Sequence, residues 1–151
     1  MKGEALTTLI TQTHRAVYRA REIELLSVGL SVEAADAISQ IKNLGGPSTS
    51  ELSRALVREP QSISSLIYRL EKTGLVKRVR VNKGMQKNQV NIQLTKKGEE
   101  VYERVASMTV ATDIGAVISE KEAQTLELSL TKIKKAALVK MRDPGPLPLS
   151  E

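Results

Sequence analysis

The chain has 151 residues, of which 40% are apolar and 26% charged, a balance typical of a folded globular protein with a core of its own. It contains no cysteine, which excludes a disulfide framework, a thiol redox sensor and a cysteine-ligated metal site. The net charge of +6 arises in residues 47–100, where eleven basic side chains face five acidic ones, while both flanking segments are neutral. Because a local basic surface attracts polyanions, this distribution favours a nucleic-acid partner.

The first two predicted elements are helices. Apolar residues at helical spacing predict a long first helix that ends near Gly29. Ser31 is suited to cap a second helix, because its hydroxyl can accept a hydrogen bond from a free N–H of the first turn. Gly45, Gly46 and Pro47 then stop this helix.

Two short helices follow around a tight break. Ser48 and Glu51 form a capping-box pattern that opens the third helix. After the break at residues 57–60, Pro60 suits the first turn of a fourth helix, which Gly74 ends. The apolar stripe of the fourth helix is expected to consist of Ile63, Leu66, Ile67 and Leu70.

A hairpin and two further helices complete the chain. Residues 75–81 and 90–94 predict two strands, the second with Val90, Ile92 and Leu94 on its buried face, joined by a polar, basic tip. A fifth helix is expected over residues 96–115, and a sixth from Ser119 to about Arg142. The tail, residues 144–149, has Pro at every second position and is expected to be extended.

Two short helices and a basic hairpin predict a winged helix-turn-helix. The fourth helix is narrow enough for the major groove of double-stranded DNA. Gln61 has the donor and acceptor that read adenine, and Arg69 is able to reach a guanine or a phosphate. The residues predicted to contact DNA from the helices are Ser48, Thr49, Gln61, Ser62, Ser64, Ser65, Tyr68 and Arg69. The alternative is that the serines are only the exposed face of an ordinary helix, although serine is a mediocre helix former.

Four basic residues in the hairpin extend the predicted DNA contact: Arg78, Arg80, Lys83 and Lys87. The hairpin tip is expected to lie along a phosphate backbone or to enter the minor groove. Charges on a hairpin edge also prevent strand-to-strand aggregation, but that role explains one or two lysines and not four basic residues.

Four segments together resemble the core of the MarR family of regulators: Ser50–Leu56, Pro60–Ser64, Leu70–Val76 and Leu94–Gly98. The order of six helices, with the wing between the fourth and fifth, is also similar. The resemblance implies a mainly α fold with a small β-hairpin wing, in which a winged helix-turn-helix is flanked by long dimerisation helices.

The wing departs from the family pattern at two positions. The family usually carries an Asp that supports the wing and, two residues later, an Arg that contacts DNA. Counting back from Leu94, these positions are Gln86 and Asn88 here. The resemblance therefore does not transfer that arginine, and Arg80, Lys83 or Lys87 is left to substitute for it.

The resemblance further implies a single structural unit and a homodimer. Residues 1–30 and 116–151 are then dimerisation helices, residues 31–95 the DNA-binding region and residues 96–115 a connecting helix. The implied function is transcription regulation, by repression, through a pseudo-palindromic operator.

Many relatives release DNA when a small anionic or phenolic ligand binds. His14, Tyr18 and Arg21 on the first helix are the candidate residues for such a pocket. A single histidine on a helix is, however, more often a surface or interface residue.

Other functions receive little support from the sequence. The single histidine, the lack of a glycine-rich phosphate loop and the lack of clustered ligands argue against an enzyme, a metal site and a cofactor. No signal-peptide profile and no long apolar run are present, so we expect a cytoplasmic protein without a membrane partner. The remaining alternatives are a protein-interaction module and a non-specific, nucleoid-type DNA binder, which the salt dependence of duplex binding would distinguish.

Overall fold

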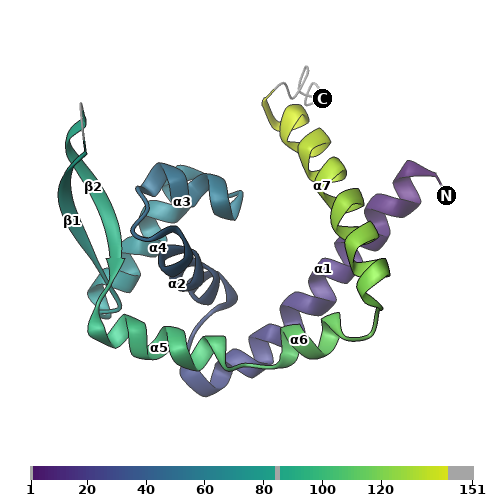
Figure 1. Cartoon of the computed structure of the whole chain (residues 1–151), viewed down its shortest axis with the longest axis horizontal. Helices are drawn as coiled ribbons and strands as arrows, with labels where there is room; N and C mark the ends of the chain where they lie inside the picture. Colours follow the sequence, from purple (N-terminus) through teal and green to yellow (C-terminus); the bar gives the residue numbers. More distant parts are fainter. Residues whose placement is uncertain (1, 84–85, 143–151) are drawn as a thin grey trace, which may run out of the picture. The chain divides into compact units, whose positions relative to one another are not determined.

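The computed structural model describes residues 2–83 and 86–142, and the chain divides between Ala111 and Thr112 into two compact units. The chain is mainly helical with a two-stranded antiparallel hairpin, as predicted (Figure 1). The elements are α1 (Gly3–Leu25), the short 3-10 helix η1 (Leu26–Val28), α2 (Val32–Leu44), α3 (Thr49–Leu56), α4 (Pro60–Lys72), β1 (Val76–Lys83), β2 (Gln86–Leu94), α5 (Lys96–Ala106), α6 (Val110–Gly115) and α7 (Glu120–Arg142).

The helix boundaries follow the capping signals of the sequence. The Ser31 hydroxyl accepts a hydrogen bond from the N–H of Ala34 at 3.2 Å and caps α2. Gly45 ends this helix at φ 68°, in the left-handed region that glycine tolerates without steric cost. Ser48 and Glu51 form the predicted capping box, in which each side chain accepts from the backbone N–H of the other residue.

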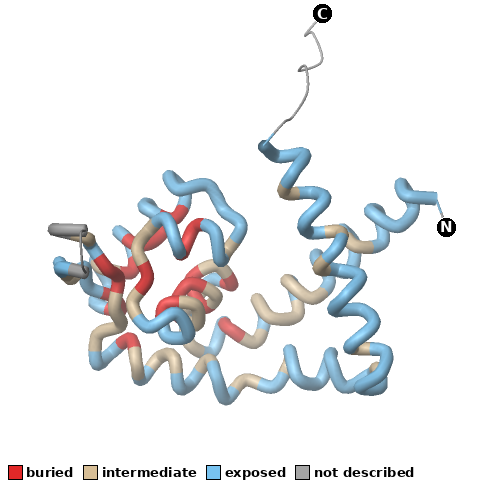
Figure 2. The backbone as a smooth tube through the Cα atoms, turned by 45° about the horizontal axis from the view of Figure 1, so that its top comes forward, coloured by how far each residue is buried: buried red, intermediate tan, exposed pale blue. Residues whose placement is uncertain are grey.

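The core of the first unit lies where α2, α3, α4 and the hairpin meet (Figure 2). It is entirely aliphatic, in keeping with a sequence that lacks Phe and Trp. The buried members of this core are Ala34, Ala37, Ile38, Ile41, Leu52, Ile63, Leu66, Ile67, Leu70, Leu75, Val76 and Ile92. All four residues predicted for the stripe of α4 are among them.

The hairpin continues the core but departs from the predicted alternation. Ile92 is fully buried, and its N–H donates to the carbonyl oxygen of Pro47 at 2.8 Å, which ties β2 to the start of α3. Val90, predicted to face inward, is 37% exposed, whereas Asn91 is only 5% exposed. Val90 pairs with Arg80, which is also exposed. Toward the hairpin tip, the core therefore ends between Asn91, which is buried, and Val90. The prediction of a regular apolar face was therefore wrong at this end of the strand.

The prediction of one continuous helix over residues 96–115 was also wrong. Helix α5 ends at Ala106, and α6 begins at Val110. The carboxylate of Glu24, on α1, accepts from the N–H groups of Thr109 at 2.9 Å and Val110 at 3.2 Å. In an uninterrupted helix these N–H groups would donate to backbone carbonyl oxygens of the preceding turn. Here the carboxylate of Glu24, 85 residues from Thr109 in sequence, accepts their hydrogen bonds instead, and a new helix begins at Val110.

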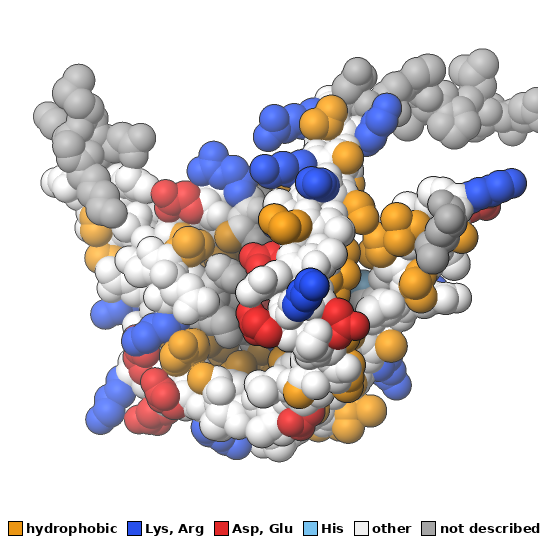
Figure 3. Space-filling view, turned by 45° about the vertical axis from the view of Figure 1, so that its right-hand side comes forward, with side chains coloured by type: hydrophobic (Ala, Val, Ile, Leu, Met, Phe, Trp, Pro, Cys, Tyr) orange, Lys and Arg blue, Asp and Glu red, His pale blue; other side chains and the backbone are white. Residues whose placement is uncertain are grey.

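The second unit is dominated by α7, which begins at the predicted Ser119–Glu122 capping box. Ser119 N–H donates to the carboxylate of Glu122 at 2.8 Å, and the Ser119 hydroxyl accepts from the N–H of Glu122 at 3.4 Å. No described residue of this 23-residue helix is buried. Several large apolar side chains are exposed to solvent, and Figure 3 shows hydrophobic side chains in orange at the surface. On α7 these are Leu126, Leu128, Leu130, Val139 and Met141.

Two further expectations are limited by the extent of the structure. The tail at residues 144–149 lies outside the described residues. Within the described part of the chain, no helix is both long enough and apolar enough to cross a lipid bilayer.

Candidate nucleic-acid interface

A fixed turn joins α3 to α4. Val57, after the last residue of α3, has φ 52°, which reverses the chain direction. The N–H of Arg58 donates to the carbonyl oxygen of Ser53 at 3.0 Å, and the buried Ser53 hydroxyl donates to the carbonyl oxygen of Arg58 at 2.5 Å. Pro60 then opens α4 at a position where an N–H would lack a helical partner. This turn determines the face that α4 presents.

Helix α4 has one buried and one exposed face. Its buried stripe is at most 5% exposed, which anchors the helix to the core. The residues predicted from the sequence to point outward are all exposed: Gln61, Ser62, Ser64, Ser65, Tyr68 and Arg69. Small hydroxyl side chains allow the backbone of α4 to approach a surface closely and to form hydrogen bonds with it.

The exposed face of α4 also carries free positive charge. Arg69 forms no ion pair within the described residues. The Nζ atom of Lys72 lies 5.0 Å from the ring centroid of Tyr68, so this ammonium group is held over the aromatic ring. Sequence reasoning missed Lys72, although its spacing of four residues from Tyr68 on one helix was a usable signal.

The hairpin offers fewer free cations than the sequence suggested. Arg78 donates to the carboxylate of Glu71 on α4 at 2.9 Å, so its charge is paired within the protein. Arg80 is exposed and forms no ion pair within the described residues. The side chains of Lys83 and Lys87 lie outside the described part of the chain, as do those of Gln86 and Asn88.

Ser48 and Thr49, at the start of α3, are half-buried. The Ser48 hydroxyl accepts from the N–H of Glu51 at 3.2 Å and therefore has a structural role as a helix cap. Of the predicted contact residues, these two lie apart from the exposed face of α4 and start a different helix.

His14, Tyr18 and Arg21 lie together on α1 and line one cavity of about 270 Å³. The opposite wall comes from α2 and from the turn between α3 and α4, and includes Glu33 and Arg58. The rings of His14 and Tyr18 lie 6.1 Å apart between centroids. The structure thus brings the three predicted pocket residues to one place.

Ion pairs and hydrogen bonds balance the charge in this cavity, which we call the α1–α2 cavity. Arg21 donates to Asp36 at 2.7 Å, and the Tyr18 hydroxyl donates to Glu33 at 2.8 Å. The hydrogen bond to Glu33 raises the pKa of Tyr18, and burial adds to this effect. Burial alone would raise the pKa of Glu33, but bonds from its own N–H and from Tyr18, with the charge of Arg58 3.8 Å away, lower it.

A metal site is not seen in the part of the chain that the structure describes. No group of three or more His, Asp or Glu side chains is arranged so that it would hold a metal ion.

Comparison with known proteins places the chain among winged-helix regulators. The MarR family model matches residues 28–84, from the end of η1 to the hairpin. The organohalide-sensing transcriptional regulator RdhR, solved with 2,4-dichlorophenol bound, is 28% identical, with a TM-score of 0.77 over 100% of this chain and 91% of that one. No functionally curated protein matches.

Two structures solved with DNA share the fold at lower identity. A MarR variant from E. coli, complexed with operator DNA, is 20% identical, with a TM-score of 0.75 over 85% of this chain and 93% of that one. The S. aureus MepR–DNA complex is 19% identical, with a TM-score of 0.73 over 90% of this chain and 98% of that one.

Proposed function

We propose that this chain, whose residues 28–84 match the MarR family model, is a winged-helix regulator that binds double-stranded DNA as a homodimer and represses transcription from a pseudo-palindromic operator. Helix α4 enters the major groove, and the hairpin follows the neighbouring phosphates. The division into dimerisation helices at residues 1–30 and 116–151 and a DNA-binding region at residues 31–95 belongs to the same proposal.

The observation that carries this proposal is the exposed face of α4. A helix with serines near its N-terminal end, followed by the unpaired Arg69, offers hydrogen-bond donors and positive charge on one surface. Arg80 on the hairpin adds a second unpaired cation. The operator complex of the MarR variant and the MepR–DNA complex are proteins of this fold bound to DNA, which supports DNA as the partner.

The lack of burial along α7 supports the homodimer. A helix of 23 residues that buries none of them gains little stability from packing, although such packing supplies most helical stability in proteins. A second copy of the chain covers the exposed leucines and places two α4 helices on successive turns of DNA.

Selection of bound fragments from randomised duplex DNA tests the proposal. The expected result is an inverted repeat with half-sites about ten base pairs apart. Binding without sequence preference would instead indicate a nucleoid-type protein. No binding at low salt would contradict the DNA proposal and favour a protein-interaction module.

Two variants distinguish reading of bases from attraction to phosphates. Arg69→Ala is expected to weaken the selected site by about 1–3 kcal/mol and to reduce discrimination against other sites. Arg80→Ala should weaken all duplexes similarly and reduce the salt slope by about one. Lys96→Ala, which removes an exposed basic residue of α5 that is not among the predicted DNA contacts, is the control for net charge. Equal, sequence-independent losses from all three variants would contradict this division of roles.

We further propose that the α1–α2 cavity takes a phenolic effector that releases DNA. Its arginines are already paired with carboxylates, so the lining suits a weakly acidic hydroxyl better than a fully charged anion. RdhR, the related regulator, was solved with a chlorinated phenol. Titration with 2,4-dichlorophenol should displace operator DNA from the wild type, and His14→Ala should weaken that response. A response unchanged in His14→Ala and in Tyr18→Phe would exclude this cavity.

A further inference from the structure

The basic residues of α7 are concentrated in its C-terminal half. The acidic residues of this 23-residue helix, Glu120, Glu122 and Glu127, all lie before Leu128. Residues 128–142 carry no acidic side chain, and their basic residues are Lys132, Lys134, Lys135, Lys140 and Arg142. The C-terminal segment is neutral as a whole, but its charges are separated along the helix. We call residues 132–142 the basic end of α7.

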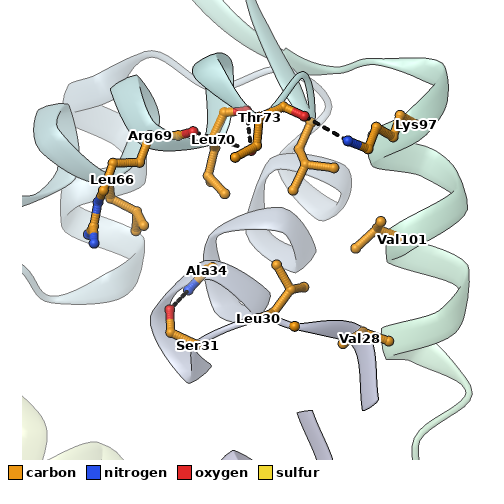
Figure 4. Close-up of a pocket in the computed structure, with 12 residues that line it drawn as sticks. Val28, Leu30, Ser31, Ala34, Leu66, Arg69, Leu70, Thr73, Lys97 and Val101 are labelled. Carbon is orange, nitrogen blue, oxygen red and sulfur yellow. Dashed lines mark hydrogen bonds between the residues drawn. The ribbon is translucent and has the colours of Figure 1, made fainter. Parts of the chain in front are cut away.

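The cations of the basic end have no ion-pair partner in the part of the chain that the structure describes. All of these side chains are exposed. Lysines of the first unit are bound within the protein instead. Lys42 pairs with Glu99 at 2.7 Å, and Lys97 on α5 donates to the carbonyl oxygen of Thr73 at 2.9 Å (Figure 4). The charge of the basic end is therefore available to a partner outside the chain.

Helix stability accounts for only part of this charge. Lys140 and Arg142 lie in the last turn, where cations interact favourably with the helix dipole and the free carbonyl groups. Lys132, Lys134 and Lys135 lie farther from the end than this effect reaches. Lys132 and Lys135 are three residues apart, so their charges repel one another on the helix surface. These cations destabilise the isolated helix, and an anionic partner offsets the repulsion.

Three of the cations share one side of α7. Lys132, Lys135 and Arg142 follow one another at intervals of three and seven residues, which places them along one side of an α-helix. Leu126 and Leu130 lie about half a turn away from them around the helix axis. In the proposed homodimer the second copy covers the leucine side, whereas the basic side stays accessible.

We propose that the basic end of α7 is a second DNA-binding surface, which contacts phosphates without reading bases and acts in addition to α4. The side from Lys132 to Arg142 extends over about 15 Å, and duplex DNA carries one negative charge per about 1.7 Å of its axis, so several phosphates lie within reach. Each phosphate contact releases counterions, which favours binding at low salt. The surface adds affinity for any duplex, and discrimination between sequences stays with α4.

Duplex DNA suits this surface better than a lipid bilayer does. A helix at a membrane surface buries a broad apolar face among the lipid headgroups. In the proposed homodimer the leucine side of α7 is not available for such insertion, and the choice of DNA rests on that proposal. A chain that α4 holds on DNA also meets further phosphates at a high effective concentration.

Salt titration of binding to a random-sequence duplex tests the proposal in the full chain. Lys132→Gln combined with Lys135→Gln should reduce the slope of log affinity against log salt by about two, because each lost phosphate contact removes about 0.9. The preference for a selected operator over the random duplex should not change. Arg15→Gln combined with Lys121→Gln removes two exposed basic residues outside the basic end. This matched control should keep the slope of the wild type, and light scattering should give one mass for all three proteins.

Four results would overturn this proposal. An unchanged slope in the Lys132 and Lys135 variant would show that the basic end contacts no phosphate, and an equal decrease in the control would show an effect of net charge alone. Loss of the dimer in that variant would assign the cations to a contact between copies. Loss of its binding to phosphatidylglycerol vesicles, with an unchanged slope on DNA, would assign them to lipid. Because the duplex has a random sequence, failure to select an operator would contradict the proposed function and leave this test valid.

Discussion

At the scale of single residues, the turn between α3 and α4 contains a strained valine. Val57 has φ 52°, and its β-branched side chain disfavours this left-handed conformation. The hydrogen bonds between Ser53 and Arg58 hold the turn closed in spite of this cost. The geometry of the turn, and with it the orientation of α4, is therefore maintained by its surroundings.

Val57→Gly should increase the free energy of unfolding. Relief of the left-handed strain is worth about 1–2 kcal/mol, from which the extra chain entropy of glycine removes about 0.5–1 kcal/mol. Little burial is lost, because Val57 is 44% exposed. Urea unfolding measures the change, and Val57→Ala is the control. An equal gain in both variants would show that the side chain, not the backbone conformation, is responsible.

A second prediction at this scale concerns acid stability. The pKa of Glu33 lies below its usual value of 4.5 in the folded chain, since its hydrogen bonds and Arg58 outweigh the effect of burial. A carboxyl whose pKa is depressed on folding contributes stability that is complete above the unfolded pKa and is lost as the pH falls through the folded pKa.

The free energy of unfolding should therefore decrease below pH 4.5 more steeply in the wild type than in Glu33→Gln. Tyr18→Phe, which removes one hydrogen bond to the carboxylate, should give an intermediate slope. Urea unfolding over a series of acid pH values measures these slopes. Identical slopes in the wild type and Glu33→Gln would contradict the assignment.

At the scale of elements, the N-terminus of α5 is closely packed against the end of α4. Thr95 caps α5 through Gly98 N–H, while its hydroxyl donates to the carbonyl oxygen of Gly74 at 2.5 Å. A Cβ atom on Gly98 would lie 2.0 Å from the carbonyl oxygen of Leu75. Glycine is therefore required at position 98, where the first turn of α5 meets the segment between α4 and β1.

Gly98→Ala should destabilise the first unit by about 1–3 kcal/mol or more, since backbone rather than a flexible side chain must move. Gly115→Ala is the matched control, because a Cβ there meets nothing within 4 Å. The control should be neutral or slightly stabilising, as expected for alanine in a helix. Thermal unfolding of both variants measures the difference. Similar effects of the two substitutions would show that helix propensity, and not the contact, is decisive.

At the scale of the whole molecule, the two units differ in burial: the first has an aliphatic core, whereas no described residue of the second is buried. The exposed leucines of α7 include Leu126 and Leu130, which share one face at a spacing of four residues. In the proposed homodimer these residues are buried, and folding is then linked to association.

The midpoint of thermal unfolding should therefore rise with protein concentration. Leu126→Glu combined with Leu130→Glu should produce a monomer and abolish this dependence. Gln124→Glu, an exposed polar position on the same helix, should leave both unchanged. Light scattering measures the mass. A wild-type monomer with a concentration-independent midpoint would contradict the proposed dimer.

The sequence by itself determined the features encoded over a few neighbouring residues. Capping boxes at Ser48 and Ser119, the stop at Gly45 and the buried stripe of α4 were all predicted and confirmed. The exposed face of α4 followed from the same periodicity. Each of these signals acts within one or two helical turns, so the identity of the local residues is sufficient.

Only the tertiary structure decided the features that depend on distant partners. Glu24 divides the predicted fifth helix, Glu71 pairs with Arg78, and the core ends before Val90 on β2. Lys97 on α5 donates a hydrogen bond to the carbonyl oxygen of Thr73, 24 residues earlier in the chain. No local pattern specifies such contacts, because their energy depends on which side chains the folded backbone brings together, and not on the spacing of residues within a segment.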